Sequence, residues 1–195
     1  MELTMKRKVC RALICLFLIH AVLVTSVFAS DSSDATKLDL DGKVIKMIEP
    51  GQKATDFTIE DLNGDEFKLN DVIGEKVVFL FFWSIFCRPC QEEIPIVQEM
   101  YEKVGKENIA ILAVSLDGDR RVPAIEKFVA KHNLNFTFLM DVFDDAEEGF
   151  IASDMYGVMG TPTAYIIDKK GVVTYNHTGN ATLDDLMKKV ADASK

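Results

Sequence analysis

Cysteine is scarce in this sequence: 195 residues contain four, and two of them lie in an apolar segment near the N-terminus. The other two, Cys87 and Cys90, are three positions apart. Such a pair cannot be the framework of a disulfide-rich fold, because it closes almost no loop of the unfolded chain. It could be half of a zinc site, but His132 and His177 do not supply the remaining ligands at the usual spacing. We therefore expect no metal and no other cofactor.

Positive charge is also in short supply. The chain has 22 basic and 31 acidic residues, a net charge of −9. Without residues 1–29 there are 18 basic and 30 acidic residues, and the net charge is −12. This balance argues against nucleic acid and anionic lipid as partners. A solvated acidic surface accounts for it, and a basic protein partner is the alternative.

The only long apolar run is at the N-terminus. Four basic residues precede the apolar residues 12–29, which end in Val27-Phe28-Ala29 before an abruptly polar stretch. This pattern predicts a signal peptide over 1–29, cleaved after Ala29. An uncleaved membrane anchor is the alternative, because about 18 apolar residues are just enough to span a bilayer. Either way, we expect the rest of the chain to be periplasmic or otherwise extracytoplasmic, where disulfides persist. It divides into a polar tether, 30–46, and one domain, 47–195.

The two cysteines follow an apolar strand directly. Residues 77–83, VVFLFFW, are too few for a typical helix and favour a buried strand. A helix-favouring run begins at Gln91, so the pair lies where a strand passes into a helix. Free N–H groups and the helix dipole stabilise a thiolate there, and thiolate is the reactive form of cysteine. Arg88 adds a cation, and Pro89 suits the first turn of a helix.

Apolar periodicity and turn signals predict the other elements. A hairpin is expected around Asn63-Gly64, with strands at 57–59 and 66–69. The remaining strands are predicted at 109–116, 136–140, 163–168 and 172–176. Helices are predicted at 91–106 with a kink at Pro95, at 121–132, at 144–156, and after Thr182 with Asp185 in a capping box. Alternating strands and helices in the middle of the chain indicate parallel strands with helical crossovers.

At this point the sequence resembles a known family. The layout and the segment Trp83-Ser-Ile-Phe-Cys87-Arg-Pro-Cys90 are similar to the thioredoxin superfamily, and more narrowly to exported TlpA/ResA-like thiol-disulfide oxidoreductases. The similarity also covers Gly51–Phe57 and Gly160-Thr161-Pro162-Thr163. It implies an α/β thioredoxin-like fold: a central mixed sheet flanked by helices, with an N-terminal β-hairpin extension and a central αβ insertion.

The resemblance also implies roles for individual residues. Cys87 would be the exposed attacking thiol and Cys90 the buried resolving thiol of a redox-active disulfide. Pro162 would match the family's cis-proline and, with Thr161, hold an extended substrate, although Thr161-Pro162 could simply begin a strand. Glu93 would match a carboxylate that manages the proton on Cys90, the alternative being a solvated helix glutamate.

Three positions near the cysteines complete the comparison with the family. Thioredoxin has an aspartate six residues before its first cysteine, and here that residue is Phe81, which places more weight on Glu93. Trp83 matches the family tryptophan, and the resemblance implies that it contacts the substrate together with Thr161 and Pro162. Phe86 replaces a residue that is often tryptophan, and it is either part of the substrate-contact surface or a cover for the strand end.

We therefore expect an exported enzyme that exchanges disulfides with dithiol- or disulfide-bearing proteins. The resemblance favours a reductant, as in cytochrome c maturation, with apocytochrome c as one such client and a membrane or exported protein as electron donor. A peroxiredoxin-like thiol peroxidase is an alternative, but Leu80 stands where its loop would need proline. A metal chaperone or redox-sensing module is the non-enzymatic alternative.

Overall fold

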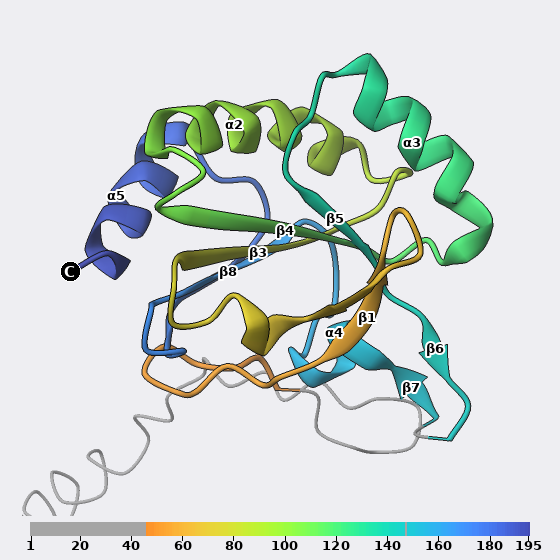
Figure 1. Cartoon of the computed structure of the whole chain (residues 1–195), viewed down its shortest axis with the longest axis horizontal. Helices are drawn as coiled ribbons and strands as arrows, with labels where there is room; N and C mark the ends of the chain where they lie inside the picture. The colour runs from red at the N-terminus through yellow and green to blue at the C-terminus, as the bar shows by residue number, and fades with distance from the viewer. Residues whose placement is uncertain (1–45, 147) are drawn as a thin grey trace, which may run out of the picture. The chain divides into compact units, whose positions relative to one another are not determined.

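Strand β3 (Val77–Trp83) is an interior strand of a seven-stranded mixed sheet in our computed structural model, which describes residues 46–146 and 148–195 (Figure 1). It pairs in parallel with β4 (Ile109–Ser115), which pairs in parallel with β5 (Thr137–Met140). On its other side it pairs antiparallel with β8 (Thr163–Ile167), followed by β9 (Val173–Thr178). The three parallel strands therefore end at one edge of the sheet.

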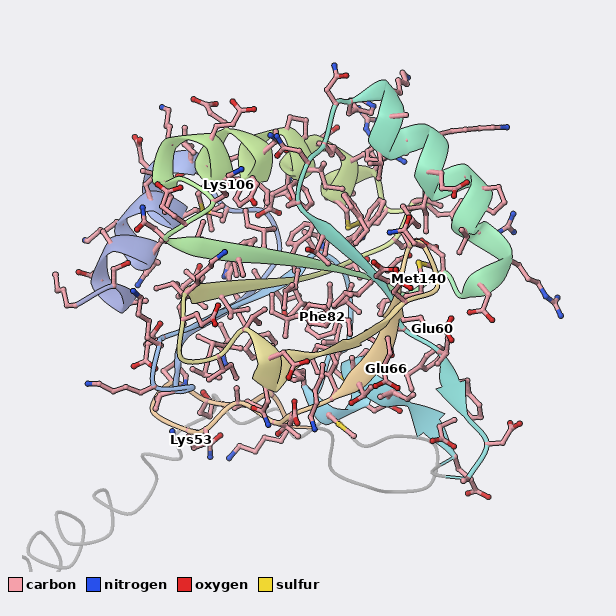
Figure 2. All side chains as sticks on the ribbon, in the orientation of Figure 1. Lys53, Glu60, Glu66, Phe82, Lys106 and Met140 are labelled. Atoms are coloured by element: carbon pink, nitrogen blue, oxygen red, sulfur yellow. A yellow bond between two sulfur atoms is a disulfide. The ribbon has the colours of Figure 1, made fainter. Side chains whose placement is uncertain are left out.

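The side chains of β3 alternate between two cores. Val77, Phe79, Phe81 and Trp83 face a core completed by the helices α2 (Arg88–Val104), α3 (Val122–Lys131) and α5 (Leu183–Ala193). Val78, Leu80 and Phe82 face the other core, which includes residues of the short helix α4 (Ile151–Met155) (Figures 1 and 2). All seven residues of β3 are buried, as the apolar run predicts.

The N-terminal hairpin extends the same sheet. Strands β1 (Thr58–Asp61) and β2 (Glu66–Lys68) pair antiparallel around Asn63-Gly64, and β1 adds to the free edge of β5. The 3₁₀ turns Leu69–Asp71 (η1) and Asp119–Arg121 (η2) lead into β3 and α3 respectively. The expected central insertion is α3 with β5. The predicted fold is thus confirmed.

Helix boundaries follow the capping chemistry. Cys87 is the N-cap of α2, with Pro89 in its first turn, and Gly105 at φ 86° ends the helix. Pro95 lies inside α2, which continues through it as one helix, and the kink there stays a prediction. One half of the predicted capping box of α5 is present: the Asp185 N–H donates to Thr182 Oγ1 over 3.2 Å, whereas the Asp185 carboxylate accepts from the Thr182 hydroxyl and not from its backbone N–H. No helix in the described ranges is long and apolar enough to cross a bilayer.

The helix predicted over 144–156 is wrong for most of its length. The chain forms the two-stranded sheet β6 (Phe143–Asp144) and β7 (Gly149–Phe150), and only Ile151–Met155 is helical. Side chains of aspartate redirect the backbone: Asp144 accepts from the Ala146 N–H over 2.8 Å. Buried Asp141 accepts from Ala152 and Ser153 and so begins the helix late. The acidic residues are therefore turn and cap residues, which sequence periodicity does not distinguish from a helical first turn.

The predicted signal peptide or anchor, 1–29, and nearly all of the tether, 30–46, lie outside the described residues, and they stay predictions.

Candidate functional site

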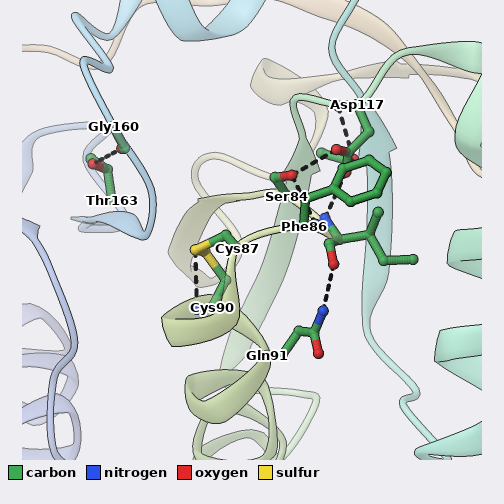
Figure 3. The surroundings of a disulfide bond; sticks show 10 residues. Ser84, Phe86, Cys87, Cys90, Gln91, Asp117, Gly160 and Thr163 are labelled. Carbon is green, nitrogen blue, oxygen red and sulfur yellow. Dashed lines mark hydrogen bonds between the residues drawn. A yellow bond between two sulfur atoms is a disulfide. The ribbon is translucent and has the colours of Figure 1, made fainter.

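A disulfide joins Cys87 to Cys90 at the start of α2 (Figure 3). Cys87 is half-buried, whereas Cys90 is fully buried against the core. The Cys90 N–H donates to Cys87 Sγ over 3.2 Å, so the Cys87 side chain caps the helix. In the dithiol form, the same N–H and the helix dipole would stabilise a thiolate on Cys87. The sulfur of Cys87 is therefore the accessible one of the pair, and the sulfur of Cys90 is covered.

Glu93 lies three residues after Cys90 and is only 1% exposed. One carboxylate oxygen, Oε1, accepts from the Ala181 N–H over 3.3 Å, whereas Oε2 has no hydrogen-bond partner within the part of the chain that the structure describes. Burial disfavours the charged form and raises the pKa of Glu93 from 4.5 to about 7, although the Ala181 bond opposes the shift. A solvated helix glutamate does not describe this residue. Near neutral pH its carboxyl group can both accept and release a proton.

The turn before Cys87 is fastened by side chains from two other elements. Asp117, which follows β4, accepts from Ser84 Oγ over 2.7 Å and from the Ile85 N–H over 2.8 Å. Ser84 Oγ in turn accepts from the Phe86 N–H over 3.1 Å, and Gln91 Nε2 donates to the Ile85 carbonyl (Figure 3). Each of the three residues before Cys87 is thus held by at least one hydrogen bond.

The Thr161–Pro162 peptide bond is cis. Because Phe82 pairs with Thr163 across β3 and β8, Pro162 lies at the sheet edge from which the cysteine segment starts. Pro162 is buried and Thr161 is half-buried. The Pro162 carbonyl accepts from the Gly179 N–H over 2.8 Å, and Thr163 Oγ1 donates to the Gly160 carbonyl over 2.7 Å. The proline loop is therefore held in place beside the cysteine segment.

The remaining predicted residues differ in their exposure. Phe86 is 70% exposed, with the Arg121 guanidinium 5.0 Å from its ring centroid, so it does not cover the strand end. Trp83 is fully buried against Phe128 and Phe138, and it offers no surface to a substrate in this structure. The prediction of direct substrate contact by Trp83 therefore does not fit. Arg88 is exposed and forms an ion pair with Glu92 at 3.0 Å.

Comparisons with known proteins agree with this geometry. The model of the AhpC/TSA family matches residues 50–176. The chain is 35% identical over 146 residues to the thiol-disulfide oxidoreductase ResA of Bacillus thuringiensis subsp. konkukian (strain 97-27), covering 73% of this chain and 79% of ResA. It is 38% identical over 136 residues to ResA of Geobacillus thermodenitrificans (strain NG80-2), covering 70% and 73%. The chain belongs to the ResA-like thiol-disulfide oxidoreductases of the thioredoxin superfamily.

A solved structure supports the fold of this ResA-like protein. It is a secreted Mycobacterium tuberculosis disulfide oxidoreductase homologous to E. coli DsbE, 28% identical, with a TM-score of 0.58. The alignment covers 70% of this chain and 95% of the other. Thiol-disulfide oxidoreductases act on dithiols and disulfides, so the ResA-like chain is an enzyme whose substrates are proteins that carry these groups.

Sequence reasoning missed Asp117 in this ResA-like site. The signal was present, because Asp117 comes two residues after a buried strand that runs parallel to β3. Polar residues directly after parallel strands meet at one sheet edge, so Asp117 could have been placed near Ser84. Arg121 and Gln91 gave no comparable signal, since neither lies next to the end of a strand. Within 46–146 and 148–195 no group of three or more His, Cys, Asp or Glu residues is arranged to hold a metal ion.

We expect Asp117→Ala to destabilise the oxidised protein by about 2–3 kcal/mol, because hydrogen bonds to a charged group contribute about 1.5–3 kcal/mol each and the lost ones are partly replaced by water. Three donors lose their acceptor, namely Ser84 Oγ, Ser115 Oγ and the Ile85 N–H. Urea unfolding monitored by tryptophan fluorescence measures the loss. Asp119→Ala, which removes an exposed carboxylate from the same loop, is the control, and equal stability of both variants would contradict the prediction.

Proposed function

We propose that this chain is an exported reductant of protein disulfides, in which Cys87 attacks, Cys90 resolves and Glu93 carries the proton. One observation carries the proposal: a half-buried sulfur at a helix N-terminus is bonded to a fully buried one. An accessible sulfur meets the client and a covered sulfur reacts only within the protein.

The proposed reaction begins with the dithiol form. The Cys87 thiolate attacks one sulfur of a client disulfide, the client S–S bond breaks, and the client's leaving sulfur takes up a proton. A mixed disulfide now joins Cys87 to the client. The client is not yet fully reduced at this stage, because one of its two sulfurs is still bonded to Cys87.

The second step releases the client. Cys90 gives its proton to the Glu93 carboxylate, attacks Cys87 Sγ, and breaks the mixed disulfide. The released client sulfur takes up a proton, so the client gains two electrons and the enzyme holds the Cys87–Cys90 disulfide. With a pKa of about 7, Glu93 is present in both protonation states near neutral pH. A membrane or exported dithiol protein then reduces the enzyme.

In this proposal three residues contact the substrate. Phe86 presents an exposed ring next to Cys87, and the loop of Thr161 and cis Pro162 lies at the same sheet edge. A rigid aromatic side chain and a fixed loop can position an extended client with little loss of conformational entropy. Apocytochrome c is one client of this kind, in keeping with the resemblance noted from the sequence.

The proposed cellular location of the enzyme rests on the N-terminal segment, residues 1–29. The basic residues before an apolar run and the small residues ending at Ala29 favour a cleaved signal peptide and a periplasmic or otherwise extracytoplasmic enzyme. An uncleaved leader would add membrane contact through residues 12–29 alone. The AhpC/TSA match keeps a peroxidase as a second candidate, and the metal-chaperone or redox-sensor alternative predicts no turnover.

The test uses the chain from Ser30 to Lys195, alongside the full-length protein in membranes. We expect catalytic turnover of a protein disulfide with a dithiol donor and a reduction potential low enough to reduce such clients, in the range of thioredoxin, about −270 mV. A potential near that of DsbA, about −120 mV, would reverse the proposed direction. Rapid consumption of hydrogen peroxide without disulfide turnover would favour the peroxidase.

A further inference from the structure

Segments after two of the three parallel strands form a pocket, and Asp117 connects it to the turn before Cys87. Cys87 follows β3, and the pocket, about 340 Å³ in volume, is built from the loops that follow β4 and β5. Ligands of open α/β sheets bind outside the carboxyl ends of the strands, which is the edge in question. The pocket is lined by Leu116, Asp117, Gly118, Asp119, Arg120, Asp141, Val142, Phe143 and Phe150.

This pocket is directly connected to the turn that carries Cys87. Asp117 is part of its wall, and the carboxylate of Asp117 holds Ser84 and Ile85. Figure 3 shows Phe86 and Asp117 on the same side of the disulfide. The exposed ring of Phe86 contacts Arg121, which is next in sequence to Arg120 in the pocket wall. A surface therefore leads from Cys87 over Phe86 to the pocket.

The far side of the pocket presents two exposed aromatic rings. Phe143 is 54% exposed and Phe150 is 38% exposed, and their rings meet edge to face at 5.6 Å. Both belong to the β6–β7 hairpin, which is a separate two-stranded sheet and not part of the large one. Large aromatic side chains left open next to a pocket are typical of surfaces that bind another polypeptide.

The charge of the hairpin indicates the kind of partner. Residues 143–150 contain Asp144, Asp145, Glu147 and Glu148 and no basic residue. Of the two cations in this region, Arg121 contacts the Phe86 ring and Arg120 lines the pocket, and neither belongs to the hairpin. A ligand that reaches the hairpin is therefore favoured by positive charge at that end and by an apolar group in the pocket.

We propose that the pocket and the β6–β7 hairpin bind the client chain next to its reactive cysteine, and that they select an apolar side chain followed by basic residues. This inference rests on the proposed disulfide exchange at Cys87. A polypeptide whose cysteine is bonded to Cys87 continues along the surface over Phe86, whereas a small disulfide ends there. The acidic balance of the chain suits the same basic client.

The test compares two peptide disulfides with a small disulfide, 5,5′-dithiobis(2-nitrobenzoate). One peptide carries a leucine and two lysines next to its cysteine, and the other carries a serine and two glutamates. We expect Asp145→Lys/Glu148→Lys to raise KM for the basic peptide about tenfold, and Phe143→Ser/Phe150→Ser to do the same by removing apolar contacts. The reaction with the small disulfide stays unchanged in both variants. Asp71→Lys/Glu75→Lys, an equal change of charge at two exposed residues before β3 at the opposite sheet edge, is the matched control.

Several outcomes would overturn the inference. Equal KM values for the two peptides with wild-type protein, or a KM for the basic peptide that neither variant changes, would show that this surface does not select clients. An equal rise in KM in the Asp71→Lys/Glu75→Lys control would show that the effect comes from net charge alone. Failure of the wild-type protein to reduce even the small disulfide would instead refute the exchange reaction itself. Thermal unfolding of each variant confirms that the fold is retained.

Discussion

The Cys87→Ser protein is expected to lose disulfide reduction by a factor of about 10³ or more, because the attacking sulfur is gone. Cys87 is the sulfur that the fold leaves half-exposed and that caps α2. Serine keeps the cap, since its hydroxyl oxygen can accept from the Cys90 N–H. The fold should therefore persist while the reaction stops, and a turnover assay with a protein disulfide measures this.

Cys90→Ser is expected to give a different failure. Cys87 can still attack, but no sulfur remains to break the mixed disulfide, so enzyme–client adducts accumulate. Non-reducing electrophoresis and mass spectrometry of the purified adducts measure their abundance. Because Cys90 is fully buried, it should form few adducts in the Cys87→Ser protein. Equal trapping by both variants would contradict the division of roles between the two sulfurs.

The arrangement around the cysteines was partly readable from the sequence. The run VVFLFFW predicted a buried strand, and Pro89 after Cys87 predicted a helix start, because both signals are local. All seven residues of β3 are buried, and α2 begins at Arg88, three residues before the start predicted at residue 91. Burial of Glu93 was not readable, because it depends on Ala181, 88 residues further along the chain. The helical spacing placed the Glu93 side chain on the same face as Cys90, but it did not show which segment covers that side chain.

The acidic segment after β5 shows the opposite difficulty. Asp144 and its neighbours resemble the first turn of a helix, where acidic residues are favoured. Their side chains instead bond to nearby backbone N–H groups in turns, and Asp141, three residues earlier, caps the true helix. Turn and cap chemistry compete with helix formation at the same residue types. Only the tertiary structure decides between them, and here it creates the exposed hairpin next to the site.

Replacing Phe81 with aspartate, the residue that thioredoxin has at this position, would destabilise the fold. Phe81 is fully buried in the core that also contains Cys90, and it stacks on Phe79. A charge introduced there would have to be desolvated, which costs several kcal/mol unless it is paired. The fold of this chain therefore leaves Glu93 as the buried carboxylate closest in sequence to the thiols.

Glu93→Gln is expected to slow disulfide exchange by on the order of a hundredfold, the contribution typical of a general acid or base. The side chain keeps its size, and its carbonyl can still accept from Ala181, but it cannot take a proton from Cys90. In the wild-type protein the base is the carboxylate, so the rate should rise with pH through about 7, the pKa of Glu93. That inflection should be absent in Glu93→Gln. Rate–pH profiles for exchange and for thiol alkylation measure both effects.

The thiol and the carboxyl group should also influence each other. A negative Glu93 raises the pKa of a nearby thiol, because two negative charges repel. The two groups then titrate as a coupled pair in the wild-type dithiol. Glu93→Gln should lower the pH at which the slower-reacting thiol is alkylated. Glu99→Gln, on the exposed side of the same helix and paired with Lys103, is the control that should leave both profiles unchanged.

The stability of the oxidised protein gives a test of Glu93 that does not depend on catalysis. The pKa of Glu93 is about 7 in the folded state and near 4.5 in the unfolded state. Between these values the folded protein holds a proton that the unfolded chain has released, so stability falls as pH rises from about 4.5 to 7. At about 1.4 kcal/mol per pKa unit, the loss is on the order of 3–4 kcal/mol and is complete above pH 7. Glu93→Gln should therefore be more stable than wild type at pH 8 by this amount, with the difference vanishing toward pH 4. Denaturant unfolding at a series of pH values measures it, and identical pH dependence in both proteins would mean that Glu93 is solvated and that the proton on Cys90 leaves by another route.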